Sequence, residues 1–216
     1  STDEVYGSNN HKSSLEKDQY KPRSPYSSSK ASTDHIAMSY YHTYNLPLSI
    51  VNFCNNYGPY QFIEKFIPNT INNILLNKKI PIYGNGKNIR EWIFVDDCCE
   101  AIFKILNNFN SGKKYNIGSG IRTSNIDIVK NIIEIFNENK KYKITFDNAV
   151  RFVKDRPGHD FRYAINSNLF RKEMKWKPKI SLKEGLRRTI EWYINNHKWL
   201  KYSRKKYDGK RQGLND

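Results

Sequence analysis

Strand-like and helix-like segments alternate along most of the chain, and this order constrains the fold more than any other feature of the sequence. Runs rich in β-branched and aromatic residues are short, whereas the segments between them have the composition and length of helices. The predicted strands are 48–53, 80–83, 92–95 and 115–118, and the predicted helices are 26–44, 64–77, 97–107, 124–136 and 181–196. Because parallel strands need a crossover connection, usually a helix, this order predicts a parallel α/β architecture.

Local signals at the segment boundaries refine this prediction. Ser124 and Ser181 each stand three positions before an acidic residue, as in a capping box, and Asp97 stands in the same relation to Glu100. We therefore expect helices to begin at these three positions. Outside the helices, a strand end, a turn and a second turn are expected at 1–6, 55–59 and 84–86.

The charge is strongly positive, because 37 Lys and Arg face 21 Asp and Glu, for a net charge of +16. Most of the excess lies in residues 151–216, and the sequence has no zinc-ligand spacing, helix-turn-helix signature or ribonucleoprotein motif. We predict no nucleic-acid partner and no bound metal. No apolar run approaches the roughly 18 residues of a membrane span, and the three cysteines form no disulfide framework. A cytoplasmic protein without a membrane partner is the expectation.

A Tyr-x-x-x-Lys pattern stands at the start of the first predicted helix. The spacing places Tyr26 and Lys30 on one helical face, with β-carbons about 5 to 6 Å apart. A lysine cation there would lower the pKa of the tyrosine from about 10 toward neutral pH and make it a base for a sugar or alcohol hydroxyl. The alternative is a solvated helix in which the spacing has no function.

Adjacent carboxylates, Asp3 and Glu4, stand at a predicted strand end. Two neighbouring carboxylates can serve as acid and base when their environments separate their pKa values. A solvated acidic loop is the alternative reading of the same residues.

Taken together, these patterns form an ordered set of motifs. The set comprises 1–7, 24–30, 55–60, 64–68, 81–86, 90–92, 115–118 and 155–160. It resembles the extended short-chain dehydrogenase/reductase superfamily and, more narrowly, the dTDP-glucose 4,6-dehydratases. The resemblance covers the chain to about Trp199 and leaves the basic tail without a counterpart.

The resemblance implies a reaction sequence that uses NAD. Tyr26, helped by Lys30, would remove the proton of the hydroxyl on the fourth carbon of the sugar while that carbon gives a hydride to NAD⁺. Glu4 would remove the proton on the fifth carbon, and Asp3 would protonate the hydroxyl that leaves the sixth. Thr2 would hydrogen-bond the oxygen on the fourth carbon. Return of the hydride would give a 4-keto-6-deoxy sugar.

The resemblance also implies the ligand contacts. Arg90 and Arg156 suit a diphosphate, because a guanidinium binds phosphate oxygens bidentately. Tyr83 is either a stacking partner for the base or a core tyrosine. The implied cofactor contacts are Tyr26, Lys30 and Asn56. The implied substrate contacts are Thr2, Asn55, Lys65, Phe66, Pro81, Ile82, Tyr83, Arg90, Asn125, Asp155, Arg156, Pro157, Gly158 and His159.

The carboxylate pair narrows the chemistry within the superfamily. Sugar 4-epimerases have small or hydroxyl residues where Asp3 and Glu4 stand, so the triplet favours 4,6-dehydration of a glucose nucleotide. The triplet does not report the base, and UDP-glucose remains an alternative to dTDP-glucose. A truncated paralogue that binds without catalysis is a third possibility.

The family fold is a Rossmann-like doubly wound parallel sheet with a Gly-rich turn after its first strand, and no G-x-G-x-x-G occurs in this sequence. We therefore expect the C-terminal part of a longer enzyme, without the first βαβαβ half, that binds NAD weakly and has little activity when isolated. The full-length form is expected to be a homodimer. Residues 1–57 and 88–119 would be the remainder of the dinucleotide-binding domain, 58–87 and 120–200 a smaller α/β substrate domain, and 201–216 a basic tail.

Overall fold

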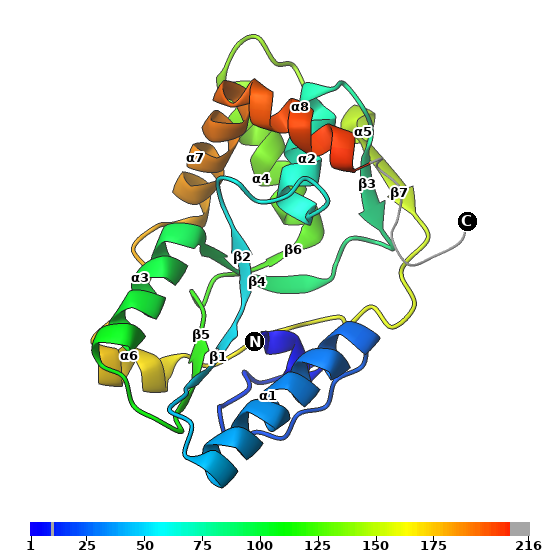
Figure 1. Ribbon diagram of the computed structural model, residues 1–216. Helices are drawn as coiled ribbons and strands as arrows, with labels where there is room; N and C mark the ends of the chain where they lie inside the picture. The colour runs from blue at the N-terminus through cyan, green and yellow to red at the C-terminus, as the bar shows by residue number, and fades with distance from the viewer. Residues whose placement is uncertain (10, 208–216) are drawn as a thin grey trace.

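The computed structural model describes residues 1–9 and 11–207 of the 216-residue chain. Its elements alternate between strands and helices, as the sequence predicts (Figure 1). In chain order they are η1 (Asp3–Tyr6), α1 (Pro25–Tyr44), β1 (Ile50–Phe53), β2 (Asn55–Tyr57), α2 (Phe66–Leu75), β3 (Ile80–Tyr83), β4 (Ile89–Phe94), α3 (Val95–Asn107), β5 (Lys114–Ile117), β6 (Arg122–Ser124), α4 (Asn125–Glu138), α5 (Phe146–Ala149), β7 (Val150–Val153), α6 (Asn168–Met174), α7 (Leu182–Asn195) and α8 (His197–Lys206).

The strands pair mainly in parallel. Within the described residues, β1 pairs with β5, β2 with β4 and β3 with β7, all in parallel. The other named strand, β6, runs antiparallel to β4 and places Arg122 directly opposite Glu91. Helices connect the parallel strands, so the predicted parallel α/β architecture is confirmed.

Two of the expected backbone conformations are wrong. Only Thr2 pairs with β1 at the start of the chain, in an isolated parallel bridge to Phe53, and the next four residues turn into the 3₁₀ helix η1. The segment expected to be a turn at 55–59 begins with β2, whose residues pair with Trp92–Phe94. The β2 strand depends on pairing with the distant β4, which local turn residues do not report, whereas η1 is a local turn capped by the Thr2 side chain.

Helix starts follow the local signals at two of three positions. Ser124 and Ser181 cap α4 and α7, and each side chain accepts a hydrogen bond from the main-chain N–H three residues on. Asp97 is not a cap, because α3 has already begun at Val95. Its buried carboxylate accepts instead from the main-chain N–H groups of Lys179 and Ile180, at 2.9 and 3.0 Å. A tertiary contact has replaced the local one.

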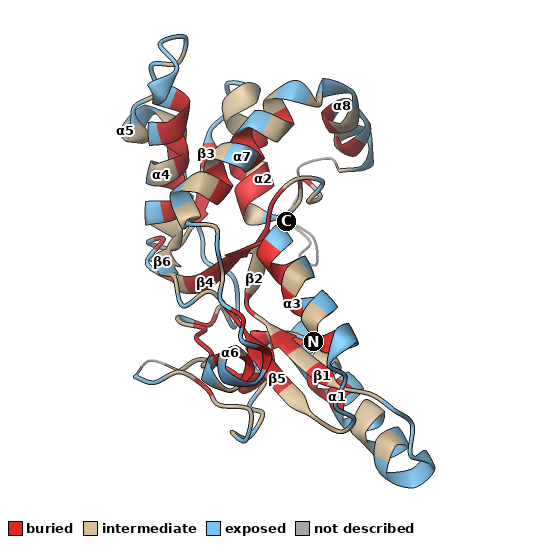
Figure 2. Cartoon of the chain, turned by 90° about the vertical axis from the view of Figure 1, so that its left-hand side faces the viewer, coloured by how far each residue is buried: buried red, intermediate tan, exposed pale blue. Residues whose placement is uncertain are grey.

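Burial concentrates in three apolar clusters (Figure 2). The first lies among α2, α4, α7 and α8 together with β2 and β4, in the upper part of the view in Figure 1. The second joins η1 and α1 to α3, β5 and α6 in the lower part. The third lies between α4 and the β3–β7 pair. β4 therefore runs between the two larger clusters, and its residues can act on both sides.

The expected basic tail is ordered in its first half. Residues 197–206 form α8, with Leu200 and Ser203 buried, and Trp199 contacts Trp192 of α7 at a ring-centroid distance of 5.1 Å. The part of the predicted tail at 208–216 lies outside the described residues. None of the described helices combines the length and apolar character of a membrane span.

Candidate active site

The Thr2–Asp3–Glu4 triplet lies where the chain leaves the edge of β1. Thr2 bridges to Phe53, the last residue of β1, and its hydroxyl oxygen accepts from the N–H of Glu4 at 3.3 Å, which caps η1. Gly7 ends η1 with φ of 70°, and a β-carbon there would lie 2.3 Å from the carbonyl oxygen of Lys21. Only glycine fits this approach. The carboxylates therefore occupy the carboxyl end of the strands, where open α/β sheets bind their ligands.

Asp3 is a buried acid with an unsatisfied oxygen. It is 3% exposed, and its Oδ2 has no hydrogen-bond partner among the described residues. Burial raises the pKa of Asp3 well above its usual value, and the charges of Glu4 and Glu91 raise it further. The raised pKa favours the protonated form of Asp3, which is the form that can give a proton to a leaving group.

Glu4 is half-buried and stands among cations. Burial raises the pKa of Glu4, but the guanidinium groups of Arg90 and Arg156 oppose that rise. The two neighbouring carboxyl groups thus have different electrostatic surroundings. Arg90 and Arg156 both act to lower the pKa of Glu4, whereas the charges of Glu4 and Glu91 act to raise the pKa of Asp3. This difference is what an acid–base pair needs.

Tyr26 and Lys30 lie one turn apart at the start of α1. Ser24 caps this helix, and its side chain and that of Ser27 satisfy each other's main-chain N–H groups in a capping box. The Lys30 ammonium lies 5.9 Å from the centroid of the Tyr26 ring. The two residues share a face of the helix, as the spacing predicts.

The direction of the Tyr26 pKa differs from the sequence expectation. Burial raises the pKa of Tyr26, and the charges of Glu4 and Asp3 raise it further. The expected lowering of this pKa by Lys30 is not seen, and the Lys30 ammonium lies 5.9 Å from the ring centroid. Helix α1 packs against η1, so Tyr26 lies in the same part of the molecule as the two carboxylates whose charges act on it.

Arg90 of β4 is fixed by main-chain oxygens. It is 7% exposed, and its Nη atoms donate to the carbonyls of Ile89, Asp160 and Phe161 at 2.8, 2.9 and 3.3 Å. Its guanidinium carbon lies 4.3 Å from the centroid of the Tyr163 ring. Since most of its hydrogen-bonding capacity serves the protein, Arg90 acts at this site chiefly as a fixed cation.

The 155–159 segment folds around one carboxylate. Asp155 Oδ1 accepts from the N–H of Arg156 at 2.8 Å and lies 2.7 Å from Nδ1 of His159. Burial acts to raise the pKa of Asp155, but these two bonds lower it, and the net effect is a lowered pKa. Burial lowers the pKa of His159. The side chain of Arg156 is exposed and stands 5.9 Å from the ring centroid of Tyr83. Arg156 and Tyr83 therefore place a cation beside an aromatic ring, an arrangement suited to nucleotide binding.

The other predicted contacts lie on β2, α2, β3, α4 and the 155–159 segment. Asn55 and Asn56 of β2 each carry a buried side-chain oxygen with no partner among the described residues. Lys65, just before α2, is exposed. Ile82 is 1% exposed in the third apolar cluster, so only its main chain can reach a ligand. The half-buried members of the set are Phe66, Pro81 and Asn125, and the exposed ones are Pro157 and Gly158.

Comparison with known proteins assigns the family. The family model described as GDP-mannose 4,6 dehydratase matches residues 1–189, most of the chain. The chain belongs to the GDP-mannose 4,6-dehydratase family. Its relatives carry narrower names. A dTDP-glucose 4,6-dehydratase of Escherichia coli is 41% identical over 229 residues, which cover 99% of this chain and 63% of that protein.

Solved structures show the same fold for this member of the GDP-mannose 4,6-dehydratase family. A dTDP-glucose 4,6-dehydratase from Streptomyces venezuelae with NAD bound superposes with a TM-score of 0.87 at 39% identity, covering 92% of this chain and 59% of that one. One from Bacillus anthracis, in complex with NAD, gives 0.85 at 44%, covering 94% and 63%. The fold is therefore of the Rossmann type, and the chain spans less than two thirds of the length of these relatives.

Sequence reasoning left two polar groups of this family member without a role. Asp160 and Tyr163 follow the 155–159 segment, at 2% and 5% exposure, and the Tyr163 hydroxyl lies 2.8 Å from Oδ2 of Asp160. The same hydroxyl lies 3.5 Å from Oε2 of Glu4. Asp160 closes a recognised motif, but nothing in the sequence shows that Tyr163 reaches Glu4 of the Thr2–Asp3–Glu4 triplet.

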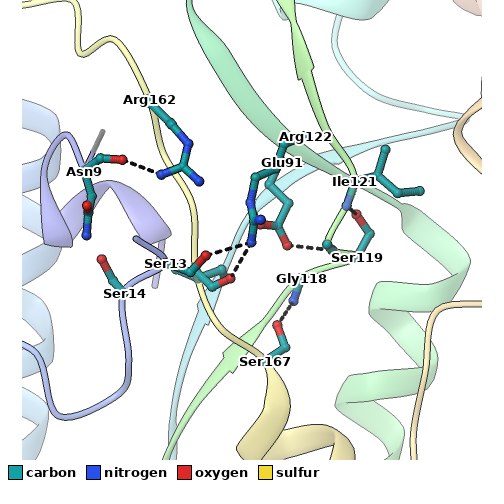
Figure 3. Close-up of polar contacts among 12 residues, drawn as sticks. Asn9, Ser13, Ser14, Glu91, Gly118, Ser119, Ile121, Arg122, Arg162 and Ser167 are labelled. Carbon is teal, nitrogen blue, oxygen red and sulfur yellow. Dashed lines mark hydrogen bonds and ion pairs between the residues drawn. The ribbon is translucent and has the colours of Figure 1, made fainter. Parts of the chain in front are cut away.

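An ion pair between the buried Glu91 and the partly exposed Arg122 was also missed (Figure 3). Glu91 of β4 is fully buried, with Oε1 accepting from the N–H of Gly120 at 2.8 Å and Oε2 lying 3.2 Å from Nε of Arg122. Arg122 also donates to Ser13 and to the carbonyl of Ile165, at 2.9 and 3.2 Å. The pair joins β4 and β6 to two loops. The cross-strand register that creates it depends on pairing, which the sequence alone does not show.

Proposed function

We propose that this chain forms the catalytic and substrate-binding part of an NAD-dependent lyase, a nucleotide-sugar 4,6-dehydratase that converts dTDP-glucose to dTDP-4-keto-6-deoxyglucose. The observation that carries the proposal is the pair of adjacent carboxyl groups, Asp3 and Glu4, held in different electrostatic surroundings beside Tyr26. Elimination of water needs one group that gives a proton and one that takes a proton. Tyr26 next to them is suited to take the proton of a sugar hydroxyl during the oxidation that comes before this elimination.

The residues present fit NAD. Tyr26 and Lys30 stand at the open start of α1, and the unpartnered side-chain oxygen of Asn56 is suited to accept from a carboxamide such as that of nicotinamide. When bound, NAD would supply the redox chemistry that makes a ketone at the fourth carbon of the sugar. The family members of known structure named above were solved with NAD.

Each protein group then has one proton to handle. Tyr26 takes the proton from the hydroxyl on the fourth carbon, and Thr2 orients that oxygen. The ketone acidifies the hydrogen on the fifth carbon, and Glu4 removes it. Asp3 gives its proton to the hydroxyl leaving the sixth carbon, so that water departs. The raised pKa of Asp3 favours the protonated form that this step needs.

The nucleotide end of the substrate is assigned to the side of the site formed by β3 and the 155–159 segment. Tyr83 and Arg156 lie face to face there, and Lys65 and Arg156 add exposed positive charge suited to a diphosphate. Relatives at about 40% identity are named for dTDP-glucose, which favours that substrate over UDP-glucose.

The protein containing this chain in its natural length tests the proposal. We expect release of the 4-keto-6-deoxy product from dTDP-glucose, faster than from UDP-glucose, and loss of turnover in Glu4→Gln. Preference for UDP-glucose would show that the nucleotide part of the substrate is UDP and not dTDP. Binding of nucleotide sugar without turnover would support a non-catalytic paralogue. The 216-residue chain alone should bind NAD weakly, which calorimetry would measure.

A homodimer and a cytoplasmic location complete the proposal. The outer face of α1 exposes Ile36, Tyr40 and Tyr44, at 59%, 50% and 70%, and such a surface is suited to a helix from a second copy. Sedimentation of the natural-length protein would show a dimer, and Ile36→Asp should weaken it. The division into a dinucleotide-binding and a substrate domain remains a proposal, which limited proteolysis would test.

A further inference from the structure

A cluster of three polar side chains connects helix α1 to the start of the chain. Asp34 of α1 is 5% exposed, Asn52 of β1 is fully buried, and Tyr20 of the loop before α1 is half-buried. The Tyr20 hydroxyl donates to Oδ2 of Asp34 at 2.6 Å. Nδ2 of Asn52 donates to the same oxygen at 3.4 Å and to the main-chain carbonyl of Thr2 at 3.2 Å. One amide group therefore bonds both to the helix and to the first residue of the Thr2–Asp3–Glu4 triplet.

Each of these hydrogen bonds has a defined donor. Burial raises the pKa of Tyr20, and the bond to Asp34 raises it further, so the hydroxyl keeps its hydrogen and donates it. An amide nitrogen carries two hydrogens, which serve the two acceptors of Asn52. The same nitrogen lies 3.4 Å from the Tyr20 oxygen, so the three side chains contact one another. The cluster is a fixed bridge because its donors and acceptors match.

The two ends of this bridge lead to groups assigned to the same substrate atom. Asp34 follows Lys30 by four residues, about one turn, so a bond to Asp34 holds the helix that carries Tyr26. In the proposed reaction Tyr26 takes the proton from the hydroxyl on the fourth carbon of the sugar, and the Thr2 hydroxyl orients that oxygen. These two groups come from different elements, and the bridge joins those elements.

We propose that Asn52 is a positioning residue that sets the separation between Tyr26 and Thr2 at the oxygen on the fourth carbon of the sugar. This inference rests on the proposed function. Asn52 acts through Thr2, whose main chain it holds relative to α1, and it transfers no proton itself. A displacement of about 1 Å can slow a reaction by about 100-fold, so a bond away from the reacting atoms can affect the rate this strongly.

The proposal concerns the oxidation at the fourth carbon and not the removal of the hydrogen from the fifth. The turn that follows Thr2 has a separate bond to the loop before α1, from the N–H of Lys21 to the carbonyl of Val5 at 2.9 Å. Loss of the Asn52 amide should therefore displace Thr2 more than Glu4. General damage to the fold would slow both steps, so the two carbons distinguish positioning from a structural role.

Isotope effects in the natural-length protein test this distinction. Asn52→Leu approximately keeps the side-chain volume and removes both donors, and it should lower kcat with dTDP-glucose by about 10- to 100-fold. With deuterium at the fourth carbon, the isotope effect should be at least as large as in the parent. With deuterium at the fifth carbon, it should be no larger than in the parent. A larger isotope effect at the fifth carbon, or an unchanged kcat, would overturn the proposal.

A double-mutant cycle tests whether Asn52 acts through Thr2. Thr2→Val removes the hydroxyl that Asn52 is proposed to position, so Asn52→Leu should cost at least about threefold less in kcat in that background than in the parent. Equal factors in both backgrounds would show a general structural role and contradict the inference. The matched control is Tyr115→Phe, which removes a hydroxyl bonded to Glu173 at 2.7 Å and should change kcat by the same factor in both backgrounds.

A second variant decides if Asn52→Leu does not fold, as judged by loss of cooperative unfolding in urea. Tyr20→Phe removes one hydroxyl from the cluster and should lower kcat by about threefold, with the same pattern of isotope effects. Parental kcat in a folded Tyr20→Phe protein would then reject the positioning role. A parent protein that does not convert dTDP-glucose would overturn the proposed function itself, whereas the other outcomes leave that function intact.

Discussion

Two buried carboxylates on neighbouring parts of the molecule have opposite surroundings. Glu91, at the β4–β6 corner, has a donor for each oxygen, from Gly120 and Arg122. Asp3, in η1, has an oxygen that no described residue contacts, and Glu4 stands beside it. Burial raises the pKa of both groups, but only Glu91 has strong bonds that oppose the rise.

The difference shows how a buried carboxyl group with a structural role can be distinguished from one with a chemical role. A carboxylate with satisfied oxygens is held as part of the scaffold, and its removal should cost stability. One with an unsatisfied oxygen costs stability where it stands and is retained for another reason, such as donation of a proton. Glu91 also contributes to the raised pKa of Asp3, so the two corners are electrostatically linked.

Substitutions in the catalytic corner should have the largest effect, and on rate. Asp3→Asn and Glu4→Gln should each lower kcat with dTDP-glucose by about 10²- to 10⁴-fold, because each removes a proton-transfer group. The free energy of unfolding of Asp3→Asn in urea should not fall at neutral pH, since Asp3 has few partners to lose and its burial is unfavourable. Near-parental turnover in either variant would contradict the assignment of the pair.

Substitutions at the β4–β6 corner should instead affect stability. Arg122→Met leaves the fully buried Glu91 charge unpaired and should lower the free energy of unfolding by about 3 kcal/mol. The double variant with Glu91→Gln should recover part of the loss. As a control, Arg187→Met breaks an exposed pair with Glu138 and should have little effect. Equal losses in the two arginine variants would break the comparison.

The pH dependence of stability sharpens the comparison further. The pKa of Asp3 is raised in the folded state, so the folded protein binds this proton more tightly than the unfolded chain. The corresponding contribution is complete below the unfolded pKa of about 4 and is lost as pH rises toward the folded value. The unfolding free energy of the parent minus that of Asp3→Asn should therefore fall from pH 4 to pH 7, by at most about 1.4 kcal/mol per pH unit. A flat difference would show that Asp3 is not perturbed.

Helix caps provide the smallest expected effects. Ser24→Ala and Ser181→Ala should each cost about 1 kcal/mol in urea unfolding, because each removes the side-chain acceptor of an N-cap. Only Ser24 begins the helix that carries Tyr26, so only Ser24→Ala should also lower kcat, by a few-fold. A similar fall in kcat for Ser181→Ala would mean that the start of α1 has no special role.

Local chemistry made much of this fold predictable. The caps at Ser124 and Ser181 depend on main-chain groups three residues away, and both are confirmed. Asp97 matches the same pattern but binds a loop about 80 residues later in the chain, at Lys179 and Ile180. The β2 strand and β6 likewise exist through pairing with β4. Contacts between distant segments therefore determine the bonding of Asp97 and the formation of β2 and β6.

The candidate site divides in the same way. Motifs located Asp3, Glu4 and Tyr26, and the structure brings them together, although their roles remain proposals. The direction of the Tyr26 pKa could not be obtained from spacing, because it depends on burial and on the charges of a different segment. Glu91 belongs to a recognised motif, but neither its ion pair nor the contact of Tyr163 with Glu4 could be predicted, because each depends on a partner more than 30 residues away in the chain.

The alternation of side chains along β4 makes the strand intolerant of changes in length. Arg90 lies against Tyr163 on one side, and its neighbour Glu91 pairs with Arg122 on the other. Deletion of one residue just before Arg90 that slipped the register would exchange the two charges between sides. Glu91 would then take the place of Arg90 beside Tyr163, and Trp92 would stand opposite Arg122 in place of the buried carboxylate. In this family, substitutions along β4 can therefore be tolerated, but insertions or deletions of a residue in this strand should be rare.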